Sequence, residues 1–343
     1  MSDIHIRVEG RVGRITLNRP KALNAVTYQM CLDIDQALQN WAGDDAVAMV
    51  LIDAVGDRAF SAGGDLGEMY ATGTAGNFDY GRRFWRDEYR MNKRMFEFPK
   101  PVVTLLQGFT MGGGVGVGCH ASHRIVGDSS RIAMPECGIG LVPDVGGSLL
   151  LARAPGRCGE YLGITGVRMG PGDAIYAGFA DYYIPEALWP ALVETLVQTA
   201  DWEAVDRAAQ PQPSSTLAAD QAQINAIFGG ETLRDILNAA RHAPSEFTET
   251  ALSRIAKNAG LSMACAVELI HRSRERDRMD VALEQEYRFT FRAMDQGDFL
   301  EGIRAQIIDK DQTPIWVHAQ AEDVTLAEVS RMLLPLGDDK LTF

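Results

Sequence analysis

Two glycine-dense turns constrain the fold of this chain more than any other feature of its sequence. The first is Ser61–Asp65, and the second runs from Met111 to Gly118. Each turn follows a short apolar segment and precedes a helical pattern, a succession that indicates parallel βαβ-type units. Glycine turns that open helices present backbone N–H groups. One such turn can bind a phosphate, and two of them on adjacent strands can direct two amides at one oxygen, as an oxyanion hole. The alternative is that the glycines only permit tight turns and close helix packing.

The other apolar patterns fit the same α/β organisation. Alternation over residues 4–17 predicts a β-hairpin, and apolar residues at helical spacing predict a helix over 27–41. Further predictions are strands at 48–52, 101–106, 124–127 and 132–134 and a helix over 78–96. The composition changes at Gln210–Ser215, and the chain beyond it is rich in helical patterns. We therefore expect an α/β core over residues 1–209 and a helix-rich C-terminal region over residues 216–343.

Composition limits the class of partner and the compartment. Of 343 residues, 46% are hydrophobic, so the chain can form a large core, and the net charge of −13 argues against nucleic acid or an anionic membrane as the main partner. No apolar run approaches 18 residues. The five cysteines stand far apart, and the N-terminus lacks a signal or transit pattern. We expect a soluble cytoplasmic protein, with homo-oligomer formation left open.

Several common catalytic machineries are excluded by their missing residues. The chain contains no Gly-Lys dipeptide and hence no P-loop, and Gly146–Leu150 lacks the closing glycine of a nucleophile elbow. His120 and His123 are the only close histidine pair, and no nearby carboxylate completes a zinc pattern with them. We therefore expect no metal site.

The segment Met134–Gly147 holds the most informative acidic residues. Glu136 and Asp144 lie in backbone broken by glycine and proline, among apolar neighbours. A carboxylate in such a place is either a helix cap or one half of an acid–base pair. Surface carboxylates usually have charged neighbours, which these two lack, so the pattern favours a functional role.

These motifs resemble, in order and spacing, those of the enoyl-CoA hydratase/isomerase (crotonase) superfamily. The segments that carry the resemblance are Asn18–Asn24, Ser61–Leu66, Gly108–Gly114 and Met134–Glu136. Three others resemble the 3-hydroxyisobutyryl-CoA hydrolase branch of that superfamily, namely Trp85–Tyr89, Pro143–Gly147 and Glu301–Asp311. The resemblance implies an α/β fold, a crotonase-like spiral of repeated ββα units with a helical C-terminal region.

The resemblance also implies roles for individual residues. The amides of Gly64 and Gly113 would hold the carbonyl oxygen of an acyl-CoA thioester. Glu136 would act on the acyl carbon, either as a nucleophile or as a general base for water. Asp144 would bind a 3-hydroxyl of the substrate, and Glu88 would line the acyl pocket.

The CoA part of the substrate would lie along a second set of residues. By the same resemblance, these are Lys21 and the loop from Ala62 to Asp65. CoA would belong to the substrate, so no separate cofactor is expected.

One departure from the superfamily pattern bears on the reaction. Hydratases place a second catalytic glutamate where this chain has Gly116, and they commonly carry glycine where it has Asp144. Losing an acid–base group costs on the order of 10²–10⁴ in rate. The departure therefore argues against hydration, and the resemblance to the hydrolase branch implies an enzyme that converts 3-hydroxyisobutyryl-CoA to 3-hydroxyisobutyrate and CoA in valine catabolism. The alternatives are a hydratase or isomerase with a single carboxylate and a non-catalytic acyl-CoA-binding protein.

Overall fold

The computed structural model describes residues 2–343, which divide into two compact units. The first unit contains the chain up to Gly64 together with Arg90–Ala133 and Arg168–Ala218; the second contains Asp65–Tyr89, Met134–Val167 and Ala219–Phe343. One passage between units, at residues 218 and 219, comes shortly after the predicted linker. The second unit also contains two earlier segments of the chain, so the units are not continuous stretches of sequence. The division into domains over 1–209 and 216–343 stays a prediction.

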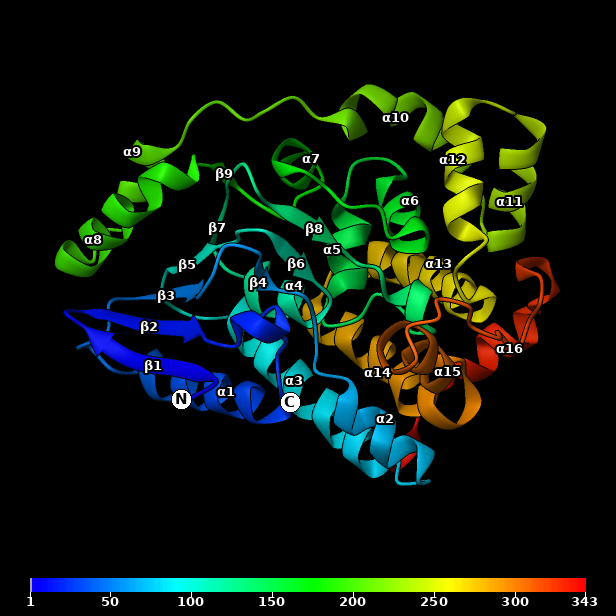
Figure 1. The fold of residues 1–343 in the computed structure, drawn as a ribbon, viewed down its shortest axis with the longest axis horizontal. Coiled ribbons are helices and arrows are strands. Elements are labelled where there is room, and N and C mark those ends of the chain that lie inside the picture. The colour runs from blue at the N-terminus through cyan, green and yellow to red at the C-terminus, as the bar shows by residue number, and fades with distance from the viewer. Residues whose placement is uncertain (1) are drawn as a thin grey trace. The chain divides into compact units, whose positions relative to one another are not determined.

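A six-stranded sheet is the centre of the first unit, in the order β1-β2-β3-β5-β7-β9 (Figure 1). Its strands are β1 (Ile4–Glu9), β2 (Val12–Leu17), β3 (Met49–Ala54), β5 (Val102–Leu105), β7 (His123–Val126) and β9 (Tyr182–Tyr183). Only β1 and β2 are antiparallel, which confirms the predicted hairpin; the other pairs are parallel. In the centre of the sheet, the first four residues of β3 and the whole of β5 are buried, as is typical of parallel strands covered on both faces.

Helices cover both faces of this sheet. On one face, α1 (Tyr28–Ala42) packs its Trp41 ring where a side chain at Gly13 would lie, only 2.6 Å away. On the other face, Val12, Met49 and Leu51 join a core cluster with α8 (Trp189–Thr199). Successive strand residues point to opposite faces, so Gly13 faces α1 and Val12 faces α8.

A second sheet of three short parallel strands has the order β4-β6-β8. The strands are β4 (Ala59–Ser61), β6 (Phe109–Met111) and β8 (Arg131–Ala133). Along the chain, β3 and β4 are followed by the helix α2 (Gly67–Thr74), and β5 and β6 are followed by the helix α4 (Gly113–Gly118). Each time, one strand of the six-stranded sheet is followed by one strand of the second sheet and then by a helix. This succession confirms the predicted repeat of ββα units. Four further helices of this unit are η1 (Pro20–Ala22), α7 (Pro171–Tyr176), η3 (Glu186–Leu188) and α9 (Ala204–Ala208).

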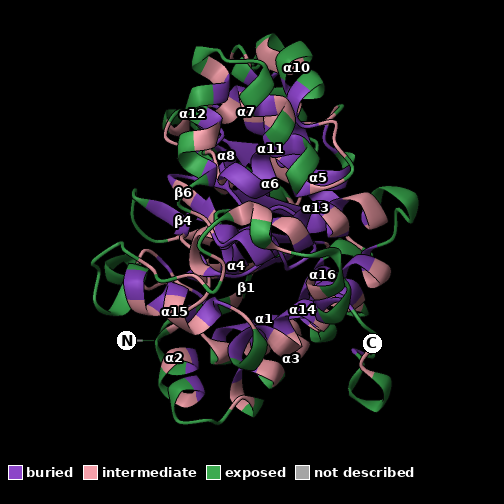
Figure 2. Ribbon diagram, turned by 90° about the vertical axis from the view of Figure 1, so that its right-hand side faces the viewer, coloured by how far each residue is buried: buried purple, intermediate pink, exposed green. Residues whose placement is uncertain are grey.

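The second unit is helical. Its centre is α13 (Gly260–Glu275), which packs against α5 (Gly147–Arg153) and α6 (Cys158–Thr165); Figure 2 shows these elements largely buried. Its other helices are α2 (Gly67–Thr74), η2 (Glu136–Ile139), α10 (Thr216–Ile227), α11 (Leu233–His242), α12 (Glu246–Ile255), α14 (Met279–Gln296), α15 (Phe299–Ile303), η4 (Arg304–Ile308), η5 (Ala321–Asp323), α16 (Leu326–Met332) and η6 (Gly337–Asp339). The helix α3 (Asp79–Phe96) begins in this unit and ends in the first. Among the helices of residues 2–343, none combines the length and apolar character needed to cross a bilayer.

Candidate active site

The two glycine turns lie side by side in the first unit. They follow the paired parallel strands β4 and β6, in which Ser61 is opposite Thr110. A Cβ atom at Gly114 would lie 2.4 Å from the carbonyl oxygen of Ser61, and one at Gly63 would lie 3.4 Å from that of Met111. Glycine at 114 is therefore required for the helix α4 to approach the end of β4 this closely.

The amides of Gly64 and Gly113 are free of internal partners. Gly113 is the first residue of α4, a position whose N–H has no acceptor within the helix. Within residues 2–343, no hydrogen bond has the N–H of Gly64 or of Gly113 as its donor. The residue before Gly113 is Gly112, whose φ of 48° lies in a region that favours glycine. Both N–H groups can therefore donate to an acceptor that the protein does not supply.

The loop that carries Lys21 is attached to the first glycine turn. The Ala62 N–H donates to the Leu23 carbonyl at 2.9 Å, and the Val26 N–H donates to the Gly63 carbonyl at 2.9 Å. Lys21 itself is exposed. The structure thus brings Lys21 and Ala62 onto neighbouring segments of one unit. Asp65 opens the second unit, where its carboxylate accepts a hydrogen bond from the Gly67 N–H at 3.3 Å.

Glu136 begins the short helix η2 and is only 5% exposed. Its Oε2 atom is buried and has no hydrogen-bond partner among the described residues. The backbone around it is fixed, because the Ala259 N–H donates to the Cys137 carbonyl at 2.9 Å and α15 approaches through Gly302. A Cβ at Gly302 would lie 2.2 Å from the Ile139 carbonyl oxygen. Glu136 is therefore a rigidly held carboxyl group with an unused oxygen.

Asp144 is 4% exposed and has one side-chain partner, Tyr89. The Tyr89 hydroxyl donates to Oδ2 of Asp144 at 2.7 Å and lies 3.5 Å from Oγ1 of Thr290. Glu88, next to Tyr89 on α3, is 3% exposed, and its Oε1 atom has no partner within residues 2–343. Carboxyl groups from α3, η2 and the 140s loop are thus buried in the same unit.

These carboxyl groups influence one another electrostatically. Burial, together with the charge of Asp144, raises the pKa values of Glu88 and Glu136 well above the usual range. Burial raises the pKa of Asp144 itself to about 7, although the hydrogen bond from Tyr89 opposes this. None of the ion pairs within residues 2–343 involves Glu88, Glu136 or Asp144. The structure therefore brings these predicted residues into one group of coupled acids, which is typical of a functional site.

The raised pKa of Asp144 has a consequence for stability. Between its unfolded value near 3.8 and its folded value of about 7, the folded protein binds the proton more tightly, so its stability falls as the pH rises through this window. Asp144→Asn removes this dependence. We expect the free energy of unfolding in urea, taken as the variant minus the wild type, to increase by on the order of 2 kcal/mol between pH 5 and pH 8. A constant difference across that range would contradict the assignment of the raised pKa to Asp144.

Three residues next to these acids have no role predicted from the sequence. Tyr89 and Thr290 lie in the hydrogen-bond network of Asp144, and the charge of Asp144 acts on Glu286. Glu286 is fully buried in α14 and accepts hydrogen bonds from the backbone of α5. Its burial pattern is visible in the sequence, because residues 282, 286, 289 and 293 form one helical stripe that is otherwise Ala and Phe. A glutamate on such a stripe needs a partner. The stripe does not indicate which residue that partner is.

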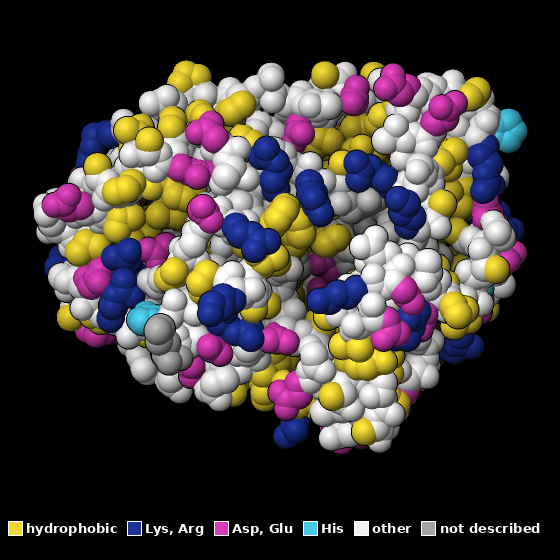
Figure 3. Space-filling model, in the orientation of Figure 1, with side chains coloured by type: hydrophobic (Ala, Val, Ile, Leu, Met, Phe, Trp, Pro, Cys, Tyr) yellow, Lys and Arg dark blue, Asp and Glu magenta, His cyan; other side chains and the backbone are white. Residues whose placement is uncertain are grey.

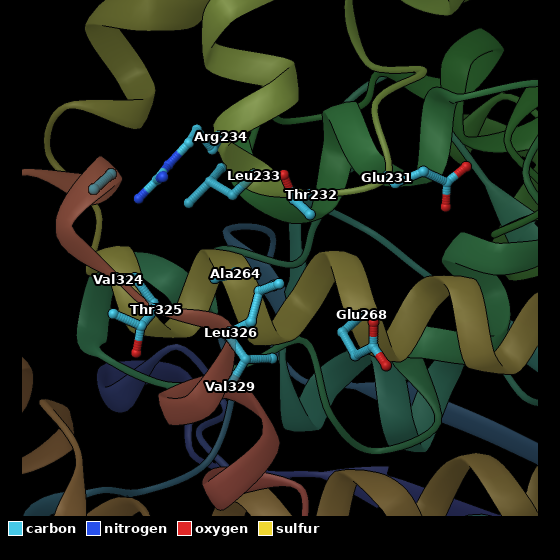
Figure 4. Close-up of a pocket in the computed structure, with 11 residues that line it drawn as sticks. Glu231, Thr232, Leu233, Arg234, Ala264, Glu268, Val324, Thr325, Leu326 and Val329 are labelled. Atoms are coloured by element: carbon cyan, nitrogen blue, oxygen red, sulfur yellow. The ribbon is translucent and has the colours of Figure 1, made fainter.

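The second unit also contains a pocket of about 350 Å³, which is not lined by Glu88, Glu136 or Asp144 (Figure 4). It is lined by Glu231, Thr232, Leu233, Arg234, Ala264, Glu268, Ala321, Val324, Thr325, Leu326 and Val329. None of these is a predicted site residue. Thr232 and Thr325 cap α11 and α16 in capping boxes, so their polar groups are already paired. Within residues 2–343, no group of three or more His, Cys, Asp and Glu side chains could hold a metal ion.

A family model described as enoyl-CoA hydratase/isomerase matches residues 12–333. The chain belongs to this family. The crotonase-like fold predicted from the sequence is confirmed by two solved structures, each with a TM-score of 0.95. One is an enoyl-CoA hydratase from Rhodobacter sphaeroides 2.4.1, 52% identical, with 100% of each chain covered. The other is a carnitinyl-CoA dehydratase from Mycobacterium thermoresistibile, 38% identical, with 100% of this chain and 99% of that chain covered.

A relative in the same family carries the name of a different reaction. The mitochondrial 3-hydroxyisobutyryl-CoA hydrolase of Rattus norvegicus is 34% identical over 353 residues, which cover 100% of this chain and 91% of the relative. Membership of the family establishes an enzyme fold that processes acyl-CoA. The names of its members divide between hydration or dehydration and thioester hydrolysis, so the specific reaction must be argued from the residues of this chain.

Proposed function

We propose that this protein is an acyl-CoA thioester hydrolase that prefers a short 3-hydroxyacyl-CoA. The observation that carries the proposal is the pair of buried carboxyl groups Glu136 and Asp144 in a chain whose position 116 is glycine. Hydration of an alkene needs an acid and a base on the reacting carbons, and Gly116 leaves one of those positions without a side chain. Hydrolysis of a thioester needs a nucleophile or base and an oxyanion hole.

In this proposal the amides of Gly64 and Gly113 hold the thioester carbonyl oxygen as it becomes an oxyanion. Glu136 then acts in one of two ways. As a nucleophile, its carboxylate attacks the acyl carbon, CoA leaves as the thiolate and takes up a proton, and water hydrolyses the mixed anhydride. As a general base, it removes a proton from a water molecule that attacks the same carbon, the C–S bond breaks, and CoA leaves as the thiolate and takes up a proton. Rapid quenching and mass spectrometry of the peptide that carries Glu136 distinguish the two routes, since only the first acylates it.

The substrate would be selected by the other predicted residues. Asp144 would accept a hydrogen bond from the 3-hydroxyl, and Glu88 would line the acyl pocket. Lys21, Ala62 and Asp65 would contact CoA, which is part of the substrate. The face drawn in Figure 3 carries exposed Lys and Arg side chains as well as acidic ones, so an acidic protein still offers cations to phosphates.

The substrate we propose is 3-hydroxyisobutyryl-CoA, which places the reaction in valine catabolism. Support comes from the hydrolase named above, which matches the chain over its full length. A cytoplasmic location remains our prediction for this chain, although that relative is named as a mitochondrial enzyme.

A hydratase is the second candidate. It is favoured by the 52% sequence identity between this chain and the enoyl-CoA hydratase from Rhodobacter sphaeroides 2.4.1. A third candidate, a non-catalytic acyl-CoA-binding protein, is disfavoured because such a protein has no use for a buried, unpaired Glu136 that costs free energy to desolvate. Purified protein tests all three with a panel of acyl-CoA esters monitored by a thiol reagent. Release of thiol fastest from 3-hydroxyacyl esters supports the proposal, and no release from any ester contradicts it.

The role of Asp144 predicts a change of selectivity. Asp144→Gly removes the acceptor for the 3-hydroxyl, and a site built to bind a hydroxyl group discriminates strongly through it. We expect the ratio of kcat/KM for 3-hydroxyisobutyryl-CoA over isobutyryl-CoA to fall by about 10–100-fold. An unchanged ratio in a folded variant would show that Asp144 does not contact the 3-hydroxyl.

A further inference from the structure

Glu286 connects α14 to the loop that carries Asp144. Its Oε2 accepts a hydrogen bond from the Gly146 N–H at 2.8 Å, and its Oε1 accepts one from the Ser148 N–H at 3.0 Å. The Ser148 hydroxyl also donates to Oε1. The carboxyl group thus holds the backbone on both sides of Gly147, at Gly146, which is 140 residues away in the sequence, and at Ser148.

The backbone between Asp144 and these contacts is in an unfavourable conformation. Val145 has a φ of 53°, in the left-handed region that β-branched residues avoid, and Gly146 follows with a φ of 82°. A β-branched residue in this region is strained and persists only where the surroundings fix it. Directly before it, the Asp144 carbonyl accepts from the Gly147 N–H at 2.6 Å. The strained turn and the bonds to Glu286 therefore determine together where Asp144 lies.

Capping of α5 alone does not account for Glu286. The N-cap residue of α5 is Gly146, which has no side chain, so Glu286 does supply the missing acceptor for the first turn. However, Glu286 is 0% exposed, and burial raises its pKa to about 8 even with these hydrogen bonds. The charge of Asp144 adds to this rise, so the cap of α5 places an acid beside the carboxyl group whose loop it holds.

We propose that Glu286 is a positioning residue that fixes the Asp144 carboxylate through the backbone of residues 145–148, an inference that rests on the proposed selection of a 3-hydroxyacyl-CoA. Glu286 itself does not touch the substrate. It sets the direction of Asp144, whose other contact is the Tyr89 hydroxyl. Misplacing a group in such a site by about 1 Å can cost on the order of 10²-fold in rate.

Glu286→Gln tests the proposal with little change of volume. An amide can accept only one of the two backbone N–H bonds, because its NH₂ group is a donor. We expect kcat/KM for 3-hydroxyisobutyryl-CoA to fall about 10–100-fold, while the value for isobutyryl-CoA changes less than about threefold. A crystal structure of the variant should show the Tyr89–Asp144 contact, 2.7 Å in the wild type, lost or lengthened beyond about 3.5 Å.

A matched control separates positioning from loss of stability. Glu160 is also 0% exposed in the second unit, where it pairs with Arg274 and His271. Glu160→Gln should lower the thermal midpoint and leave the ratio of the two kcat/KM values unchanged. Glu286→Met is the second variant, in case Glu286→Gln does not fold.

The outcomes distinguish this inference from the proposed function. If the wild type releases no thiol from either ester, the proposed function is wrong, and the Tyr89–Asp144 distance in the variant still decides whether Glu286 positions Asp144. If the wild type is active and the folded variant keeps both the selectivity ratio and the distance, the inference is overturned. It is also overturned if neither Glu286→Gln nor Glu286→Met folds, because Glu286 is then a folding residue.

Discussion

Glu136→Gln should reduce kcat for thiol release by on the order of 10²–10⁴, the usual cost of losing a catalytic base or nucleophile. The substitution removes the charge and the basicity but keeps the size of the side chain. Because Oε2 of Glu136 has no hydrogen-bond partner among the described residues, no internal contact of that atom is lost. Burial and, after it, the charge of Asp144 raise the pKa of Glu136, so a neutral amide there avoids the cost of desolvating a charge beside another acid. We therefore expect the thermal midpoint to stay constant or rise.

The control for this variant is ligand binding. Calorimetric titration with CoA should give a dissociation constant within about threefold of the wild type, since Glu136 is proposed to act on the acyl carbon and not on the nucleotide. Activity above about a tenth of the wild-type value in the folded variant would remove Glu136 from the chemical step.

Gly113→Pro should lower kcat by about 10²–10³, the typical cost of one oxyanion-hole donor. Gly113 is the first residue of α4, where proline is tolerated because the helix does not use that N–H. The substitution therefore removes the amide in question and no hydrogen bond between described residues. Circular dichroism and the thermal midpoint will report whether the variant is folded.

Gly113→Ala is the matched control for the proline variant. It adds a Cβ atom at the same buried position but keeps the N–H, so it should retain most of the activity of the wild type. Equal losses in the alanine and proline variants would mean that crowding at residue 113, and not the missing amide, is responsible. Unchanged kcat in a folded proline variant would make Gly113 a packing residue only.

The elements predicted well from the sequence are those with enough length to show their period. Alternation over residues 4–17 predicts β1 and β2, and helical spacing over 27–41 predicts α1, whose bounds are Tyr28–Ala42. The three strands of the second sheet have three residues each, and of these only β8 is predicted, as the apolar run 132–134. A segment this short carries too little periodicity to be distinguished from a loop, so the sequence does not separate β4 from the glycine turn that follows it.

The candidate site shows the same limit at the level of side chains. Glu136 and Asp144 stand out because of their apolar, glycine-broken surroundings in the sequence. The partner of Asp144, Tyr89, lies 55 residues away, and no local pattern relates the two. Glu286 is 138 residues from the Ser148 amide that it holds. Contacts of this kind depend on how helices pack and are determined only in the folded chain.

Hydrolysis of a thioester, and not hydration of an alkene, is the reaction we propose for this chain. One preparation of the wild-type protein should be given 3-hydroxyisobutyryl-CoA with a thiol reagent and, in parallel, crotonyl-CoA with its enoyl absorbance followed. Gly116 provides no second acid–base group, so we predict rapid release of thiol from the first and almost no loss of absorbance from the second. Rapid hydration of crotonyl-CoA without any release of thiol would contradict the proposal and establish the hydratase in its place.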